Sequence, residues 1–170
     1  MLKQKARILK WTEIEDTAFE ATKTAIADMT LLNFPNLDAK LSLQVDASDT
    51  AIGAVLQQQA ANGWQPLGFY SKALDDTQRR YSTFDRELLA IYSAIKHFRY
   101  MLEGRDFTIF TDHKPLTTAL TSLSDKTAKQ TRQLYFVSQF TSDIRHVSGK
   151  DNVVADSLSR FNVDSIDTSQ

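Results

Sequence analysis

The sequence predicts an α/β fold in which a mixed five-stranded sheet is flanked by helices. Three strand patterns come first along the chain, and a tight-turn signal, Asn62-Gly63, joins the second pattern to the third. Strands joined by tight turns pair antiparallel, whereas the two later strands follow helical segments and are expected to add in parallel. The predicted order of elements is therefore β-β-β-α-β-α-α-β-α.

Alternation of apolar and polar residues, or a short apolar run, marks each strand. The strand patterns cover residues 41–46, 51–59, 64–71, 107–112 and 143–147. Pro66 donates no hydrogen bond to a neighbouring strand, so the third strand is expected to lie near an edge. The apolar run at 107–112 is typical of a strand buried on both faces.

Apolar residues at helical spacing predict the remaining elements. The helical patterns cover residues 12–29, 83–102, 115–123, 128–140 and 152–160. Ser82 is the expected N-cap of the longest helix, and Gly104 is its expected stop signal. Asn152 is expected to cap the last helix.

Composition indicates one compact domain with short additions. The chain has 170 residues, 42% of them hydrophobic, which suffices for a single core. We interpret residues 1–38 as a helical linker, 39–161 as the main domain and 162–170 as a polar tail. The absence of cysteine excludes disulfides and thiolate metal sites. No apolar run approaches the length of a membrane span and no signal peptide is visible, so we expect an intracellular protein without a membrane partner.

Charge alone does not decide whether nucleic acid is a partner. The formal net charge is −1, so any basic surface must be local. Basic residues gather at 79–86 and again at 126–132, and each group taken alone is explained as a solvated helix face.

Four carboxylates occupy positions that should face the sheet, where a charge is costly without compensation. Asp46 and Asp112 end strands, Glu87 lies beside the apolar stripe of the longest helix, and Asp156 lies in the last helix. Each has an ordinary explanation when taken singly. The strand-end aspartates could cap turns, Glu87 could pair with a cation such as Arg80, and Asp156 could favour the start of its helix.

Taken together, the four carboxylates predict a metal centre. The first and fourth strands are expected to be central neighbours, with both aspartates at the carboxyl ends, where α/β sheets place their sites. Four negative charges share a pocket only when cations occupy it, and all-oxygen ligands select Mg²⁺ or Mn²⁺. Two such ions about 3.5–4 Å apart promote in-line attack of water on a phosphodiester.

Five stretches of the chain also resemble one known family, in family order across about residues 41–160. They are VDASDTAIGAVLQQ, PLGFYSKAL, YSTFDRELLAIYSAIKHFRYMLEG, FTIFTDHKPL and HVSGKDNVVADSLSR. Together they are similar to the ribonuclease H domain of the Pol polyprotein of gypsy-type LTR retrotransposons. The preceding KWTEIEDTAFEATKTAIADMTLLNFPN resembles the segment that connects the polymerase part to the ribonuclease H part. The resemblance implies a piece of a longer polyprotein whose polymerase domain is a partner.

The resemblance also implies a fold and an activity. The fold would be ribonuclease H-like, and the activity would be endonucleolytic cleavage of the RNA strand of RNA–DNA hybrids during reverse transcription. By motif, the metal ligands would be Asp46 in VDAS, Glu87 in RELLAI, Asp112 in TDH and Asp156 in VADSLSR. They would hold two Mg²⁺ ions, or Mn²⁺, with no small-molecule cofactor. A retroelement origin would place the protein in the cytoplasm, associated with a particle.

Two histidines lie close to these motifs. His146 precedes Asp156 by ten positions, and many ribonucleases H carry a histidine at about this spacing that is thought to assist proton transfer or product release. Imidazole suits that role because its ordinary pKa is near neutrality. The alternative is a packed strand residue that alternates with Ile144. The role of His113 in TDH is left open between orienting its loop and starting a helix.

Substrate contacts are predicted from the same motifs. A hybrid is recognised by its shape and its 2′-hydroxyls, and Ser48 in VDAS is the candidate for reading the RNA strand. Lys150, or Lys126 and Lys129, could hold phosphates. No additional strongly basic helix is visible between the last two carboxylates, so we expect the isolated domain to bind weakly.

Two other classes of protein share this fold. Some ribonuclease H-like modules in retroelements bind hybrids or connect domains without an active site, but the complete set of carboxylates argues against that alternative. Integrase-like nucleases place their acids in different motifs, and VADSLSR after TDHKPL argues against them.

Overall fold

The computed structural model describes residues 12–13, 16–21, 23–24, 34–122 and 126–160. The chain divides into two compact units, Met1–Phe34 and Pro35–Gln170. Within the first unit, residues 13, 16–21 and 23–24 are helical. The rest of the predicted helix at 12–29 and the tail at 162–170 lie outside the described residues. The interpretation of residues 1–38 as a linker to a polymerase stays a prediction.

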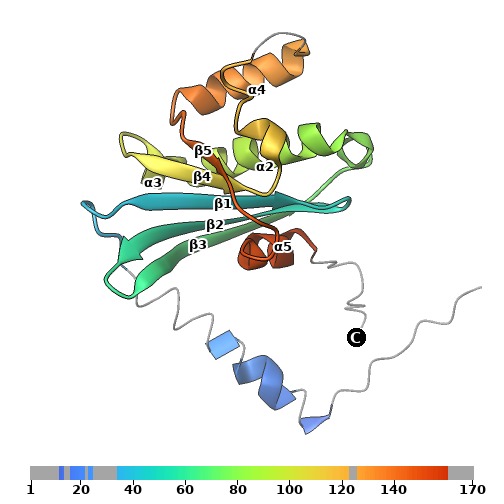
Figure 1. Ribbon diagram of the computed structural model, residues 1–170. Helices are drawn as coiled ribbons and strands as arrows, with labels where there is room; N and C mark the ends of the chain where they lie inside the picture. The colour runs from blue at the N-terminus through green and yellow to red at the C-terminus, as the bar shows by residue number, and fades with distance from the viewer. Residues whose placement is uncertain (1–11, 14–15, 22, 25–33, 123–125, 161–170) are drawn as a thin grey trace, which may run out of the picture. The chain divides into compact units, whose positions relative to one another are not determined.

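The second unit is built on a mixed five-stranded sheet with the order β3-β2-β1-β4-β5 (Figure 1). Its strands are β1 (Leu41–Ala47), β2 (Ala51–Ala60), β3 (Gly63–Ala73), β4 (Phe107–Thr111) and β5 (Ile144–His146). β2 pairs antiparallel with both β1 and β3, whereas β4 pairs parallel with both β1 and β5. The predicted fold class is confirmed, and β1 and β4 are central neighbours as predicted.

The β2–β3 hairpin follows from its turn residues. Gly63 has a φ of +112°, a conformation that glycine adopts without strain. Pro66 lies in the edge strand β3 opposite Gln57, where the register of the pairing shifts. The sheet therefore accepts the proline at its edge, as predicted.

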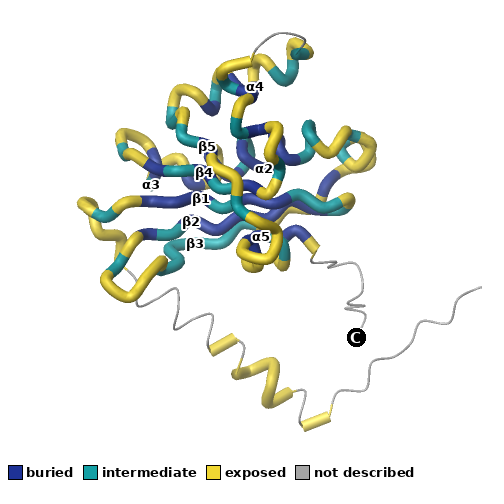
Figure 2. Tube along the Cα trace, viewed as in Figure 1, coloured by how far each residue is buried: buried dark blue, intermediate teal, exposed yellow. Residues whose placement is uncertain are grey.

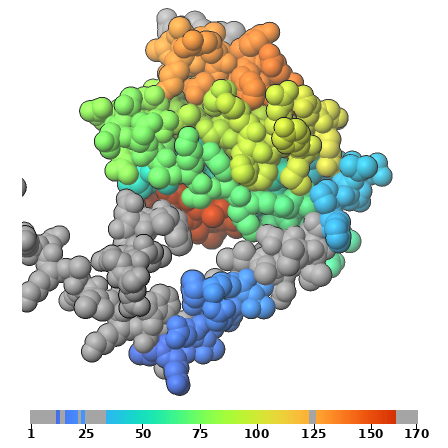
Figure 3. Space-filling view, turned by 180° about the vertical axis from the view of Figure 1, so that it is seen from behind, coloured from blue at the N-terminus to red at the C-terminus, as the bar shows by residue number. Residues whose placement is uncertain are grey.

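Helices cover both faces of the sheet. They are η1 (Gln78–Arg80), α2 (Thr83–His97), α3 (Arg99–Leu102), η2 (Lys114–Leu116), α4 (Ala128–Ser138) and α5 (Val153–Ser159). α2 and α4 lie on one side and α5 lies on the other (Figure 1), and the view from behind shows α2 covering the sheet with α4 above it (Figure 3). None of the described helices is long and apolar enough to cross a bilayer.

The core lies between the central strands and α2. Leu43, Val45, Ile91 and Ile109 are fully buried, and the buried positions follow the central strands while the hairpin tips are exposed (Figure 2). A continuous apolar cluster of this kind holds the strand ends in fixed relative positions.

The predicted helix at 83–102 is two helices. Ser82 caps the first as predicted, because its hydroxyl accepts a hydrogen bond from the Asp85 amide. The break falls at Phe98, whose φ and ψ are −92° and 14°. Phe98 is buried, and a Cβ on Gly68 of β3 would come within 2.9 Å of its ring. The break thus coincides with the contact between Phe98 and Gly68 of the edge strand.

The prediction of an α-helix at 115–123 is wrong for the described residues. The chain forms the short η2 and then turns up to residue 121. The hydroxyls of Thr117 and Thr121 donate to the carbonyls of Lys114 and Thr118, three residues earlier. Such side-chain bonds satisfy carbonyls that an α-helix would use, so threonine-rich segments favour turns.

Asn152 does not cap α5 through its side chain, although it occupies the N-cap position. It is fully buried, and its Nδ2 donates to the Val45 carbonyl of β1 at 2.8 Å. The amide therefore ties the start of α5 to the central strand, one residue before Asp46.

α5 lies very close to β2 because Gly53 has no side chain. A Cβ at Gly53 would lie 2.3 Å from the Ala155 carbonyl oxygen and 2.6 Å from the Ser159 amide nitrogen. Both are backbone atoms, so the helix itself would have to move to admit a methyl group.

Gly53→Ala should therefore destabilise the domain by about 1–3 kcal/mol, the usual cost of overpacking. Urea unfolding followed by circular dichroism measures the change. Gly149→Ala is the matched control, because a Cβ there would meet only the Asp112 carboxylate at an ordinary 3.6 Å. Equal free energies of unfolding for the two variants would contradict the close packing of α5 on β2.

Candidate metal centre

Three carboxylates from three elements meet at one end of the sheet. Asp46 belongs to β1, Asp112 directly follows β4, and Glu87 lies in the second turn of α2. One oxygen of each lies within 4.8 Å of the others. The parallel pairing of β1 with β4 brings the two aspartates to the same edge, and the packing of α2 on β1 adds the glutamate.

Glu87 is 3% exposed, which is unusual for a carboxylate. Its Oε1 accepts a hydrogen bond from the Ala47 amide at 3.2 Å, whereas Oε2 has no partner of normal geometry among the described residues. Burial raises the pKa of Glu87 to about 8, and the charges of Asp46 and Asp112 also raise it. The Ala47 amide and the Thr111 hydroxyl oppose this change.

Asp46 is also buried, at 6% exposed. Burial raises its pKa, and the neighbouring charges of Asp112 and Asp156 raise it further. Two groups favour its ionised form: the Ser159 hydroxyl, which donates to Oδ2, and the positive charge of Arg160.

Asp156, the fourth predicted ligand, lies beside the three-membered cluster. Arg160, at the C-cap of the same helix, binds its Oδ1 through Nε at 2.6 Å. The charge of Asp156 nevertheless acts on Asp46. The structure therefore brings three of the predicted ligands together and places the fourth next to them, paired with an arginine.

These residues fit a hard divalent cation. All the available donors are carboxylate oxygens, the set that Mg²⁺ and Mn²⁺ prefer. The unpartnered Oε2 of Glu87 is a buried acceptor that a cation would satisfy. A cation would also relieve the repulsion that raises the pKa values of Glu87 and Asp46.

The two motif histidines have different surroundings. His146 ends β5 and pairs with Thr111, the residue before Asp112. It is exposed, which contradicts the alternative that it is a packed strand residue. Its catalytic role stays a prediction. His113 is half-buried with its ring edge-on to Phe84, and burial lowers its pKa.

Ser48 is engaged within the domain. Its hydroxyl donates to the Ser159 carbonyl at 2.6 Å and accepts hydrogen bonds from the amides of Thr50 and Ala51 at 3.1 and 3.0 Å. A contact of this hydroxyl with RNA would therefore replace one of these hydrogen bonds or be made in addition to them. The predicted role in substrate binding stays a prediction.

Lys150 is exposed in the loop between β5 and α5. The preceding residue, Gly149, lies against the Asp112 carboxylate, so the loop borders the acidic cluster. The predicted contact of Lys150 with a phosphate has this position in its favour and stays a prediction.

The interpretation of the basic residues at 79–86 as a solvated helix face is wrong for Arg86. Its side chain is 13% exposed, and its guanidinium binds the exposed Asp49 at 2.6 Å and the Tyr81 carbonyl at 3.1 Å. It thereby ties the start of α2 to the turn after β1. Glu87 is the next residue, so this ion pair restrains the position of a cluster member.

Sequence reasoning also missed Ser159 and Arg160. They follow Asp156 by three and four positions, the spacing that brings side chains to one helix face. That spacing was the available signal. The contact of Ser159 with Asp46 had none, because the two residues are 113 positions apart.

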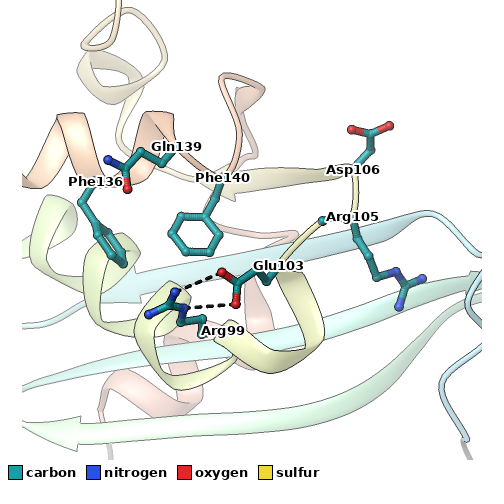
Figure 4. Close-up of a pocket in the computed structure, with 8 residues that line it drawn as sticks. Arg99, Glu103, Arg105, Asp106, Phe136, Gln139 and Phe140 are labelled. Atoms are coloured by element: carbon teal, nitrogen blue, oxygen red, sulfur yellow. Dashed lines mark hydrogen bonds and ion pairs between the residues drawn. The ribbon is translucent and has the colours of Figure 1, made fainter.

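A separate depression lies at the opposite end of β4 (Figure 4). It is lined by Arg99, Glu103, Gly104, Arg105, Asp106, Phe136, Gln139 and Phe140. Two hydrogen bonds join Arg99 to Glu103 across it. None of the predicted site residues lines it, so the acidic cluster remains the candidate site.

The family of the chain is shown by comparison with known proteins. A family profile described as "RNase H-like domain found in reverse transcriptase" matches residues 11–109. The chain is 42% identical over 147 residues to the retrovirus-related Pol polyprotein from transposon 297 of Drosophila melanogaster, covering 86% of the chain. It is 36% identical over 156 residues to the transposon Tf2-3 polyprotein of Schizosaccharomyces pombe, covering 89%.

The chain therefore belongs to the RNase H-like domains of reverse transcriptases, and its relatives are gypsy-type Pol polyproteins, as its motifs predicted. It spans only 13% and 12% of the length of these two relatives.

Solved structures show the same fold at low identity. Prototype foamy virus protease–reverse transcriptase matches with a TM-score of 0.62 at 10% identity, over 82% of this chain and 19% of that one. LC11-RNase H1 in complex with an RNA/DNA hybrid matches with a TM-score of 0.53 at 12% identity, over 71% and 93%. The ribonuclease H-like fold predicted from the motifs is confirmed.

The raised pKa of Glu87 has a consequence for stability without metal. The ordinary pKa of glutamate is 4.5, so between pH 4.5 and about 8 the folded protein holds a proton that the unfolded chain releases. Stability is therefore lost as the pH rises through this window. Glu87→Gln, which is neutral at every pH, should be more stable than the wild type above pH 8 by on the order of 1–4 kcal/mol.

Thermal unfolding in EDTA across this range measures the difference, which should vanish below pH 4.5. Mg²⁺ should stabilise the wild type more than the variant. Glu103→Gln is the control, because Arg99 lowers the pKa of the exposed Glu103. If the wild type and Glu87→Gln were equally stable in EDTA above pH 8, the buried ionised carboxylate of Glu87 would not destabilise the folded protein.

Proposed function

We propose that the chain is a ribonuclease H that cuts the RNA strand of RNA–DNA hybrids by metal-dependent hydrolysis during reverse transcription of a retroelement. The observation that carries the proposal is the cluster of Asp46, Glu87 and Asp112, in which a buried Glu87 oxygen has no hydrogen-bond partner among the described residues. Asp46 and Glu87 are buried whereas Asp112 is exposed. Buried carboxylates beside a third negative charge are costly unless cations compensate them, and an oxygen-only cluster suits the metals of phosphodiester hydrolysis.

The carboxylates and His146 have different roles in this reaction. Asp46, Glu87 and Asp112 would hold two Mg²⁺ ions, or Mn²⁺. Asp156 would join them when its ion pair with Arg160 is open. When bound, such ions activate water and stabilise the charge of the scissile phosphate. His146, exposed at the end of β5, accepts or delivers a proton at its imidazole.

The relatives support the choice of substrate and partner. LC11-RNase H1, which shares the fold, is seen with an RNA/DNA hybrid. The curated relatives are transposon polyproteins of which this chain covers about an eighth, so a polymerase domain of the same polyprotein is the proposed partner. Ser48 would read the RNA strand and Lys150 would hold a phosphate.

Asp112→Asn tests the proposed hydrolysis. It removes a charge that the ions need while preserving shape, so cleavage of a labelled hybrid in Mg²⁺ should fall by on the order of 100-fold or more. Asp106→Asn is the matched control, because Asp106 is exposed at the opposite end of β4. The wild type should cut only RNA paired with DNA and leave 3′-hydroxyl ends.

Three results would contradict the proposal: wild-type cleavage by Asp112→Asn, equal cutting of single-stranded RNA, and products with 2′,3′-cyclic phosphates. A wild type that binds the hybrid without cutting it would favour a silent binding module.

His146→Ala tests the proton-transfer role. Single-turnover cleavage should fall about 10- to 100-fold, since general acid–base help is one contribution among several. Because the side chain is exposed, the free energy of unfolding should change by no more than about 0.5 kcal/mol. His97→Ala is the control, since His97 is exposed on α2 and stacks on Tyr70. Cleavage at the control rate would remove His146 from the mechanism.

A further inference from the structure

The last turn of α5 is fastened to the sheet by serine hydroxyls. The final carbonyls of a helix have no partner within the helix and need one elsewhere. Ser71 of β3 donates to the Leu158 carbonyl at 2.7 Å, and Ser48 donates to the Ser159 carbonyl at 2.6 Å. These two bonds explain why a helix of seven residues keeps a defined position on the sheet.

The side chain of Ser159 makes a different contact. It is fully buried, and its Oγ lies 2.5 Å from Oδ2 of Asp46 and 2.9 Å from the Asp156 carbonyl oxygen. A hydroxyl has one proton, and a carboxylate is the stronger acceptor, so the proton points to Asp46. Ser159 therefore contacts Asp46, a carboxylate of the candidate metal centre, and lies three residues after Asp156, the predicted fourth ligand.

We propose that Ser159 is a positioning residue for the metal centre, holding the Asp46 carboxylate in the orientation that binds metal and coupling it to the helix that carries Asp156. This inference rests on the proposed function. Hydrogen-bond partners of metal-binding carboxylates fix their orientation, and their loss commonly lowers metal affinity 10- to 100-fold.

The geometry distinguishes this role from a purely structural one. Ser71 and Ser159 both join the last turn of α5 to the sheet through a side-chain hydroxyl, but only Ser159 contacts a carboxylate of the cluster. Close packing at Gly53 positions the helix backbone, so the helix does not depend on the Ser159 hydroxyl alone. Loss of that hydroxyl should free Asp46 more than it displaces α5.

The experiment compares Mn²⁺ binding, measured by electron paramagnetic resonance without substrate, in the wild type, Ser159→Ala and Ser71→Ala. We expect Ser159→Ala to bind Mn²⁺ on the order of 10-fold more weakly than the wild type. Ser71→Ala also removes a hydrogen bond to the last turn of α5 but should keep the wild-type affinity. Ser159→Thr keeps a hydroxyl and should restore most of the affinity.

Should Ser159→Ala fail to fold, Ser159→Cys replaces it, because a thiol has a similar shape but is a weak donor and should also weaken Mn²⁺ binding. Equal Mn²⁺ affinity in the Ser159 and Ser71 variants would overturn this inference and leave the proposed function intact. A wild type that binds no Mn²⁺ would overturn both.

Discussion

The parallel pairing of β1 with β4 at the centre of the sheet is the interaction on which the candidate site depends. It sets Leu41 opposite Phe107 and carries the two strands in step to the edge where Asp46 and Asp112 lie together. The apolar core beneath these strands is fully buried, so their relative positions are costly to change. Every other member of the site is placed with respect to this pair.

The remaining elements bring charge to that edge at a cost to stability. α2 buries Glu87 beside two aspartates, and one oxygen of its carboxylate has no hydrogen-bond partner within the described part of the chain. A buried carboxylate without a compensating charge destabilises the folded state, and a cation bound in the cluster would supply that charge. Metal binding and folding are therefore linked in the proposed function, and the metal-free domain is expected to hold its cluster partly protonated.

α5 is held on the sheet by close backbone packing and by side-chain hydrogen bonds. Gly53 leaves room for its backbone, and Asn152 ties its start to β1. Two serine hydroxyls donate hydrogen bonds to the carbonyls at its end. Each contact joins residues far apart in the sequence. The short helix is thereby held where Ser159 contacts Asp46 and where the charge of Asp156 acts on Asp46.

Local pattern in the sequence determined the strands, the Asn62-Gly63 turn, the Ser82 cap and the four carboxylates, because periodicity and turn chemistry act over a few residues. The central position of the first and fourth strands also followed, since tight turns and crossovers restrict the strand order. Only the tertiary structure decided that Phe98 divides a helix, that Asn152 bonds to β1, and that Ser159 contacts Asp46. Each outcome depends on a contact between residues far apart in the sequence, which no local pattern records.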